Sequence, residues 1–192
     1  MPEVAARIEA ARVLPVLRLP SAEEAADAAL RCIAAGVDVV ELTATTPDWP
    51  DALKRVRESA PDRVVGLGTV LDATTARQAL DLGADFLVSP CPVPAVRDAV
   101  GTRLIEGGMT VAEVLDAGRR GIAKLFPAHV GGLAFLRSLL AIEPSLRVIP
   151  TGGIGLADVP AWLDAGAYAV GIGADLIAQP DIAKALAEAV GS

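Results

Sequence analysis

Cysteine and histidine are scarce in this chain, whose 192 residues include two Cys and one His. Cys32 and Cys91 are too few for a disulfide framework, and they form no CxxC pair. With a single histidine they also offer no plausible zinc site. The absence of a disulfide framework leads us to expect a protein of the reducing cytoplasm.

Long apolar runs and an excess of basic residues are also absent. No stretch reaches the ~18 apolar residues of a membrane span. Residues 1–15 carry acids and lack an apolar signal-peptide core, so we expect a short helix there. The chain has 17 Lys and Arg against 24 Asp and Glu, a formal net charge of −7. That balance argues against a nucleic acid or a membrane as a partner.

What the chain does contain points to one folded domain. Hydrophobic residues make up 53% and charged residues 21%, which excludes an intrinsically disordered protein. The length suits a single domain covering residues 1–192, and a chain of this size can bury a large core.

Short β-branched runs recur about every 22 residues and alternate with Ala/Leu-rich stretches of helical spacing. The runs cover residues 13–18, 37–43, 63–69, 85–90, 102–107, 121–127, 146–153 and 168–173. Cap-like residues predict helix starts at Ser21, Asp48, Asp72 and Thr110. Glycines predict helix ends at Gly36, Gly83, Gly118 and Gly166.

Eight strand–helix units predict an α/β protein, a (β/α)8 TIM barrel with a short N-terminal helix. The alternative, a doubly wound open sheet, would want a GxGxxG turn after the first strand, where the chain reads LRLPSAEE. In a barrel, chemistry sits at the carboxyl ends of the strands. Those positions are Arg18, Glu41, Thr69, Pro90, Lys124, Thr151 and Gly173.

Lys124 is the most informative of these residues. It is one of only three lysines and lies in the apolar run GIAKLFP, on the same face as Ile122 and Phe126. A desolvated amine is more readily available as the free base, which can attack a ketone to form a Schiff base. The alternative is a structural lysine that reaches out of the strand end or pairs with a buried acid.

Glu41 ends the second run on the same face as Val37 and Val39. An inward carboxylate near an inward lysine fits a general acid/base for an imine intermediate. An ion pair with Lys124 or Arg18 that takes no part in chemistry explains the residue equally well.

Glycine turns follow the seventh and eighth runs, in PTGGIG and VGIGAD. Such turns of a barrel commonly bind phosphate through backbone N–H groups. Tight connections between strand and helix would need the same glycines.

Several of these segments occur together in one known family. They are PVLR (15–18), VELT (40–43), GLGTV (66–70), SP (89–90), KLFPA (124–128) and PTGGI (150–154). Nearly end to end, the chain resembles the class I aldolases for 2-keto-3-deoxy-6-phosphogluconate (KDPG) and 4-hydroxy-2-oxoglutarate. The resemblance implies a TIM-like barrel, usually a homotrimer. It implies cleavage of a 2-oxoacid substrate, phosphorylated in many members, to pyruvate and an aldehyde such as glyceraldehyde 3-phosphate. It places the chain in carbohydrate metabolism, in the Entner–Doudoroff pathway.

The resemblance also implies roles for individual residues. Lys124 matches the Schiff-base lysine and Glu41 the acid/base that moves protons. The residues matching the substrate site are Arg18, Thr69, Pro90, Thr151, Gly152, Gly153, Gly173 and Ala174. No cofactor and no metal are expected, because the iminium ion withdraws the electrons that a metal would otherwise accept.

This chain departs from the family pattern at several positions. Many members carry an arginine where Thr45 stands, and others carry one at the position of Arg18. Ala174 replaces a common serine, so we expect a smaller preference for phosphorylated substrates. Glu106 replaces a common proline, which places a carboxylate near the pocket or turns it outward. His129 stands where an acid is common, and we expect it at the surface.

Three alternatives stay open at this point. The segment TPDW (46–49) and the ending GADL (173–176) also resemble the branch that acts on 2-keto-3-deoxy-6-phosphogalactonate (KDPGal). A phosphosugar isomerase or synthase could use the same barrel and glycine turns. A non-catalytic barrel could serve as a binding or assembly unit.

Cys91 fits a small buried apolar residue better than a nucleophile.

Overall fold

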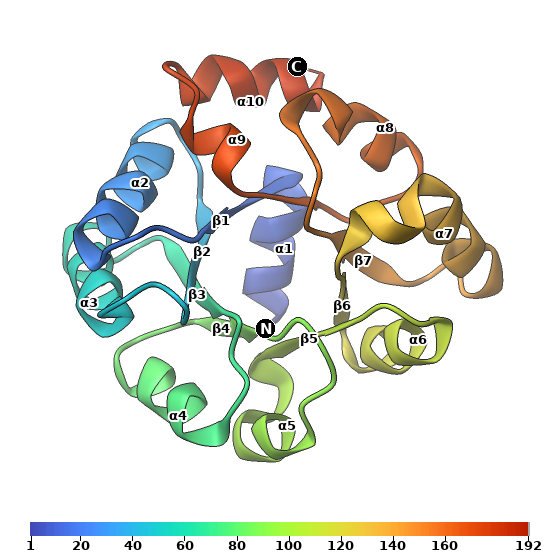
Figure 1. Ribbon diagram of the computed structural model, residues 1–192, viewed down its shortest axis with the longest axis horizontal. Helices are drawn as coiled ribbons and strands as arrows, with labels where there is room; N and C mark the ends of the chain where they lie inside the picture. The colour runs from blue at the N-terminus through green and yellow to red at the C-terminus, as the bar shows by residue number, and fades with distance from the viewer. Residues whose placement is uncertain (192) are drawn as a thin grey trace.

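Eight parallel strands form the wall of a barrel, and helices surround it (Figure 1). The computed structural model describes residues 1–191, so Ser192 of the expected domain lies outside it. The strand order is β7-β6-β5-β4-β3-β2-β1-β8. A single parallel bridge between Thr151 and Gly171 joins β7 to β8 and closes the ring. The predicted (β/α)8 barrel with its N-terminal helix is therefore confirmed.

All eight predicted strands form, each within one to three residues of its expected bounds. They are β1 (Val13–Leu17), β2 (Val39–Thr43), β3 (Val64–Gly68), β4 (Phe86–Val88), β5 (Leu104–Gly108), β6 (Ile122–Leu125), β7 (Arg147–Pro150) and β8 (Val170–Ile172). The helices are α1 (Pro2–Ala11), α2 (Ala22–Ala34), α3 (Trp49–Ser59), α4 (Ala73–Asp81), α5 (Pro94–Val100), α6 (Val111–Arg120), α7 (Ala128–Ile142), α8 (Val159–Asp164), α9 (Ala174–Ile177) and α10 (Ile182–Val190). Two short 3-10 helices, η1 (Gly101–Arg103) and η2 (Leu156–Asp158), precede β5 and α8. None of the helices within residues 1–191 is both long and apolar enough to cross a membrane.

Side-chain capping explains where α2, α4 and α6 begin. Ser21 and Asp72 accept hydrogen bonds from backbone N–H groups in the first turns of α2 and α4, and Thr110 forms a capping box with Glu113. Asp48 takes the N-cap position of α3, but its side chain makes no cap hydrogen bond.

The helix end predicted at Gly118 is wrong. α6 continues through Gly118 to Arg120, and a Cβ at Gly118 would lie 2.2 Å from Leu146 Cδ2. This glycine lets a helix pack closely and does not end one.

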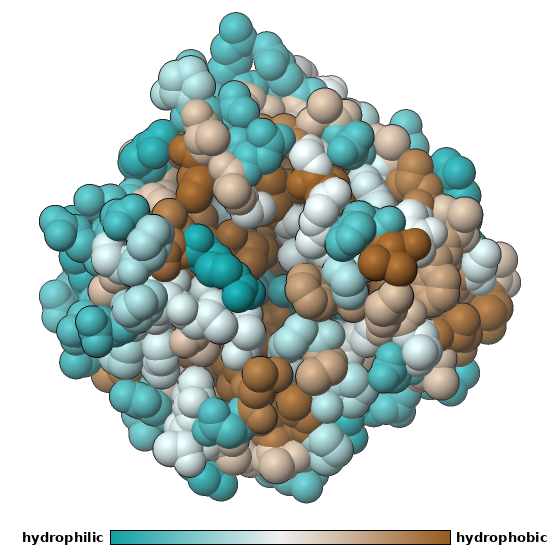
Figure 2. Space-filling model, in the orientation of Figure 1, coloured by the Kyte–Doolittle hydropathy of each residue, from teal (hydrophilic) through white to brown (hydrophobic). Residues whose placement is uncertain are grey.

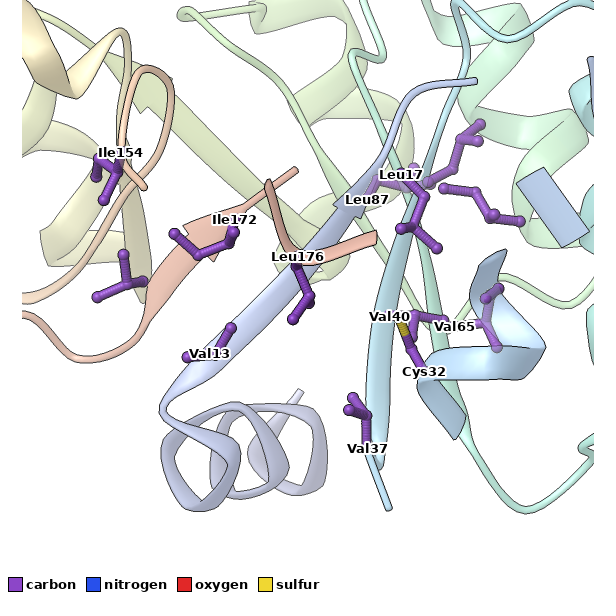
Figure 3. Packing of buried hydrophobic residues seen from close by; sticks show 14 of the residues in the cluster. Val13, Leu17, Cys32, Val37, Val40, Val65, Leu87, Ile154, Ile172 and Leu176 are labelled. Atoms are coloured by element: carbon purple, nitrogen blue, oxygen red, sulfur yellow. The ribbon is translucent and has the colours of Figure 1, made fainter. Parts of the chain in front are cut away.

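Strand alternation divides the apolar core in two. The outer core lies between the strands and the helices, where Figure 3 shows Cys32 of α2 beside Val40 of β2. The inner core fills the barrel and is covered by α1 at the amino ends of the strands. Its members are Val4, Ala5, Ile8, Leu14, Val39, Val64, Phe86, Val88, Ile105, Ile122, Ile149 and Ala169. Above this apolar layer, toward the carboxyl ends, the next inward positions include Glu41, Lys124 and Thr151.

Candidate active site

Lys124 and Glu41 form an ion pair inside the barrel. Val39 and Ile122 belong to the inner core, so the residues two positions later on β2 and β6 also point inward. The Lys124 Nζ atom lies 3.3 Å from Glu41 Oε1, and the two residues are 5% and 1% exposed. The Nζ atom also lies 5.7 Å from the centre of the Phe126 ring. The amine is thus buried, paired and fixed at one point of the barrel interior.

Glycines in neighbouring strands make room for these side chains. A Cβ on Gly68 of β3 would lie 1.9 Å from Glu41 Oε1. A Cβ on Gly171 of β8 would lie 2.2 Å from Thr151 Oγ1. The missing side chains leave the space that the polar groups occupy above the inner core, so any larger residue at either position would displace them.

A cavity of about 430 Å³ opens beside this pair at the carboxyl ends of the strands. Phe126 connects the cavity to the ion pair, because its side chain lines the cavity and its ring contacts Lys124. The lining residues are Val16, Arg18, Phe126, Thr151, Gly152, Gly153, Ile154, Gly171, Gly173, Ala174 and Asp175. Figure 2 looks onto this end of the barrel and shows polar and apolar residues mixed around its centre. The cavity therefore brings together six of the residues predicted for the substrate site.

Arg18 follows β1 and extends past the end of β2 toward the end of β3. Its guanidinium donates a hydrogen bond to Thr69 Oγ1 at 3.1 Å. The backbone on either side of it is tied to the end of β2: Thr43 Oγ1 donates to the Leu17 carbonyl oxygen, and the Leu19 N–H donates to Thr46 Oγ1. The predicted residues Arg18 and Thr69 are thus in direct contact.

The threonines that support Arg18 were not anticipated. Thr43 and Thr46 are 0% and 2% exposed and lie 3.3 Å apart through their Oγ1 atoms. Thr45 donates a hydrogen bond to Thr43, so Thr45 belongs to a hydroxyl cluster at the end of β2. The run of threonines in ELTATTP could have indicated a hydroxyl cluster. The sequence did not show that these hydroxyl groups bond to the backbone at the end of β1.

Gly152 and Gly153 follow β7 with φ angles of 97° and 70°, a conformation that favours glycine. A Cβ on Gly153 would lie 2.6 Å from His129 Nδ1. His129 is exposed, as expected, and its backbone N–H donates to the Gly152 carbonyl oxygen. The start of α7 therefore supports the glycine turn.

Pro90 lies away from the cavity lining, on the other side of Lys124. Gly107 pairs with Lys124 in the sheet, and a Cβ on Gly107 would lie 2.6 Å from the Pro90 carbonyl carbon. Pro90 is therefore the one predicted site residue that the structure places against the β5 wall of the barrel.

Glu106 is turned outward, which settles the two orientations left open for it. It is 3% exposed and accepts hydrogen bonds from the Val93 N–H, from Arg97 at 2.8 and 2.9 Å, and from Arg120 at 2.5 Å. Burial alone would raise the pKa of this carboxyl group, but these donors outweigh it and hold the pKa below its usual range.

The expectation of a buried Cys91 is wrong, because this residue is exposed. Cys91 follows Pro90 in the connection between β4 and α5. Cys32 is buried, and burial raises the pKa of its thiol to about 11, against a smaller opposing effect of Arg31. Cys32 is therefore a packing residue in the outer core.

Comparison with known proteins identifies the family. Residues 4–191 match the family described as KDPG and KHG aldolase. The chain belongs to this aldolase family. It is 35% identical to the 2-dehydro-3-deoxy-phosphogluconate aldolase of Zymomonas mobilis over 188 residues, which cover 91% of this chain and 87% of that one. Members of the family are carbon–carbon lyases, and this chain is accordingly an aldolase.

Solved structures agree with this assignment. A native KDPGal structure superposes with a TM-score of 0.80 at 29% identity and covers 94% of this chain and 96% of that one. A KDPG aldolase of Legionella pneumophila, solved with pyruvate captured as a covalent carbinolamine, gives a TM-score of 0.83 at 27% identity. That match covers 97% of this chain and 95% of the Legionella chain.

Proposed function

We propose that residues 1–192 form one catalytic domain, a Schiff-base aldolase that cleaves KDPG or a related 4-hydroxy-2-oxoacid to pyruvate and an aldehyde. For KDPG the aldehyde is glyceraldehyde 3-phosphate. The observation that carries the proposal is the buried Lys124 Nζ atom, 3.3 Å from Glu41 Oε1. A nucleophile and an acid/base group in contact, beside a cavity at the strand ends, are what imine chemistry requires.

The reaction follows from the roles of these two groups. The Lys124 amine adds to the C2 ketone to give a carbinolamine, which loses water and becomes an iminium ion. Glu41, or a water that it holds, removes the proton of the C4 hydroxyl. The C3–C4 bond then breaks, its electron pair moves toward the iminium nitrogen, and the aldehyde leaves. The resulting enamine is protonated at C3, and water hydrolyses the imine to release pyruvate and free Lys124.

The remaining predicted residues would hold the substrate. A guanidinium binds a carboxylate or a phosphate through paired hydrogen bonds, and Arg18 stands at the mouth for this purpose. Thr69 and Thr151 would line the pyruvate end, with Pro90 beside it. Gly152, Gly153, Gly173 and Ala174 would face the far end of the substrate, where backbone N–H groups are available.

A KDPGal aldolase is the alternative that a specific observation favours. The segments TPDW (46–49) and GADL (173–176) resemble that branch, and the native KDPGal structure is among the close structural matches. The two reactions use the same groups and differ only in the configuration at C4.

Borohydride trapping with pyruvate tests the imine directly. Reduction of the Schiff base should add the mass of a reduced pyruvate adduct to the peptide that contains Lys124. Lys124→Ala should abolish labelling and nearly all turnover while the circular dichroism spectrum stays unchanged. Lys184→Ala is the matched control, because Lys184 is exposed on α10, and it should label normally.

The alternatives predict different outcomes. A phosphosugar isomerase or a non-catalytic barrel would give a folded protein with no label. Labelling of Lys54 or Lys184 would also contradict the role given to Lys124. A screen of pyruvate release over phosphorylated and unphosphorylated 4-hydroxy-2-oxoacids then identifies the substrate.

We further propose that the enzyme is a cytoplasmic homotrimer. The support for the trimer is family membership together with exposed apolar side chains at one end of the barrel. The support for the compartment is the low cysteine content and the metabolic role of the relatives.

A further inference from the structure

Asp175 is a charged residue of the cavity that the predicted reaction does not use. Among the residues that line the cavity, Arg18 and Asp175 are the two with charged side chains. Arg18 donates a hydrogen bond to Thr69, just after β3, whereas Asp175 stands on α9 directly after Ala174. The cavity thus has a cationic side near β1 and β3 and an anionic side at the glycine turns.

The carboxylate is fixed where the connections that follow β7 and β8 meet. Asp175 Oδ2 accepts a hydrogen bond from the Leu156 N–H at 2.7 Å. A Cβ on Gly155 would lie 3.3 Å from the same oxygen, so the PTGGIG segment passes close to it. The Asp175 carboxylate therefore lies at Gly155 and Leu156, just beyond the glycine turn of Gly152 and Gly153, and it lines the same cavity as Gly153 and Gly173.

A carboxylate at this position opposes one kind of substrate and favours another. A phosphate monoester carries a charge of about −1.5 to −2 at neutral pH, so Asp175 repels it. A hydroxyl group instead donates a hydrogen bond to a carboxylate. The Ala174 side chain adds no donor that would offset the repulsion.

We propose that Asp175 is a specificity-determining residue that directs the enzyme toward unphosphorylated 4-hydroxy-2-oxoacids with a hydroxyl group at the far end. The inference rests on the proposed aldolase function and names the substrate class of the same site. It also assigns Arg18 to the carboxylate of the oxoacid, since the anionic end of such a substrate is its carboxylate. The phosphorylated substrate is then the poorer one, a larger effect than Ala174 alone would produce.

Asp175→Asn tests the proposal with little change in shape. The asparagine Oδ1 atom can still accept the Leu156 N–H, so this contact is kept while the charge is removed and the second oxygen is replaced by an NH2 donor. We compare kcat/KM for KDPG and for 2-keto-3-deoxygluconate, which lacks the phosphate. The variant should raise the KDPG to 2-keto-3-deoxygluconate ratio about fivefold or more, mainly through a lower KM for KDPG. Inorganic phosphate should also become a stronger competitive inhibitor.

Asp158→Asn is the matched control. Asp158 accepts the Gly155 N–H at 3.3 Å in the same connection, but it does not line the cavity. The control should leave the ratio and the phosphate inhibition as they are in the wild type.

The possible outcomes distinguish a failure of the role given to Asp175 from a failure of the proposed aldolase activity. A wild type that prefers KDPG strongly, or an Asp175→Asn variant whose ratio and phosphate inhibition are unchanged, overturns the role of Asp175 and leaves the aldolase intact. A wild type that forms no borohydride adduct with pyruvate and cleaves neither substrate overturns the proposed function. If Asp175→Asn does not fold, Asp175→Ala removes the charge without adding a donor and gives the second comparison.

Discussion

Lys124 and Glu41 are costly residues to bury. Removing two ions from water costs several kcal/mol each, and a buried pair is often no more stabilising than apolar residues of similar volume. The two residues are 5% and 1% exposed in a barrel whose lower layer is otherwise apolar. Stability therefore gives little reason for an ion pair here, whereas imine chemistry needs both groups at this point.

Glu41→Gln separates chemistry from simple pairing at the scale of one residue. The amide keeps the shape but cannot take up the C4 hydroxyl proton, so we expect imine formation with slow turnover, lower by ~10²–10⁴-fold. Borohydride trapping measures the imine and steady-state pyruvate release measures turnover. Glu188→Gln, on the exposed face of α10, is the control. An unchanged rate would reduce Glu41 to a structural partner of Lys124.

At the scale of elements, Glu106 connects four segments of the chain. Its carboxylate on β5 binds Arg97 of α5, Arg120 of α6 and the Val93 N–H in the connection after β4. That connection also carries Pro90, which rests against Gly107. One outward carboxylate therefore fixes the wall of the barrel beside Lys124.

Glu106→Gln should lower the free energy of unfolding by about 2–3 kcal/mol at neutral pH, because Arg97 loses its anionic partner and Arg120 keeps only Asp116. The folded-state pKa of Glu106 lies below its unfolded value, so this stabilisation is present above the unfolded pKa of about 4.3 and is lost as the pH falls through the folded-state pKa. The difference between wild type and variant should therefore shrink below about pH 4.3.

Urea denaturation at several pH values measures this difference. Glu188→Gln serves again as the control, since Glu188 is 70% exposed in its pair with Lys184, and it should change stability little at any pH. A constant difference between wild type and Glu106→Gln across acid pH would contradict the assignment.

The elements were predictable where local pattern decides the outcome. β-branched runs predicted every strand, and side-chain oxygens predicted the starts of α2, α4 and α6. The prediction at Gly118 failed because this glycine makes room for the Leu146 side chain, and that contact involves a residue far along the chain. The same pattern could have placed Glu106, since Gly107 on the inward face puts Glu106 on the outward face.

The site residues at the strand ends could also be predicted from the sequence. The strand-end rule selected Lys124, Glu41, Arg18 and Thr151, because a barrel brings those ends together. Asp175 and Thr46 depend on how separate connections meet in space, and no spacing in the sequence reports that. Their roles follow only from the folded chain.

At the scale of the whole molecule, exposed apolar side chains gather at the carboxyl ends of the strands. Leu71 and Val130 are each 55% exposed, and Met109 and Val111 are 45% and 38% exposed. These residues lie in or just after the connections that follow β3, β5 and β6. Figure 2 shows apolar groups on this face over the start of α7 and between α4 and α5. Such a surface suits contact between copies of the chain.

We therefore expect a trimer in multi-angle light scattering at micromolar concentration. The double variant Leu71→Asp and Val130→Asp should shift the protein toward monomer, because a charge buried in an apolar interface without a partner is strongly unfavourable. Ile142→Asp is the matched control. Ile142 is 59% exposed but ends α7 at the opposite end of the barrel, so this variant should remain a trimer. A monomeric wild type would contradict the trimer, and a double variant that stays trimeric would place the interface on another face.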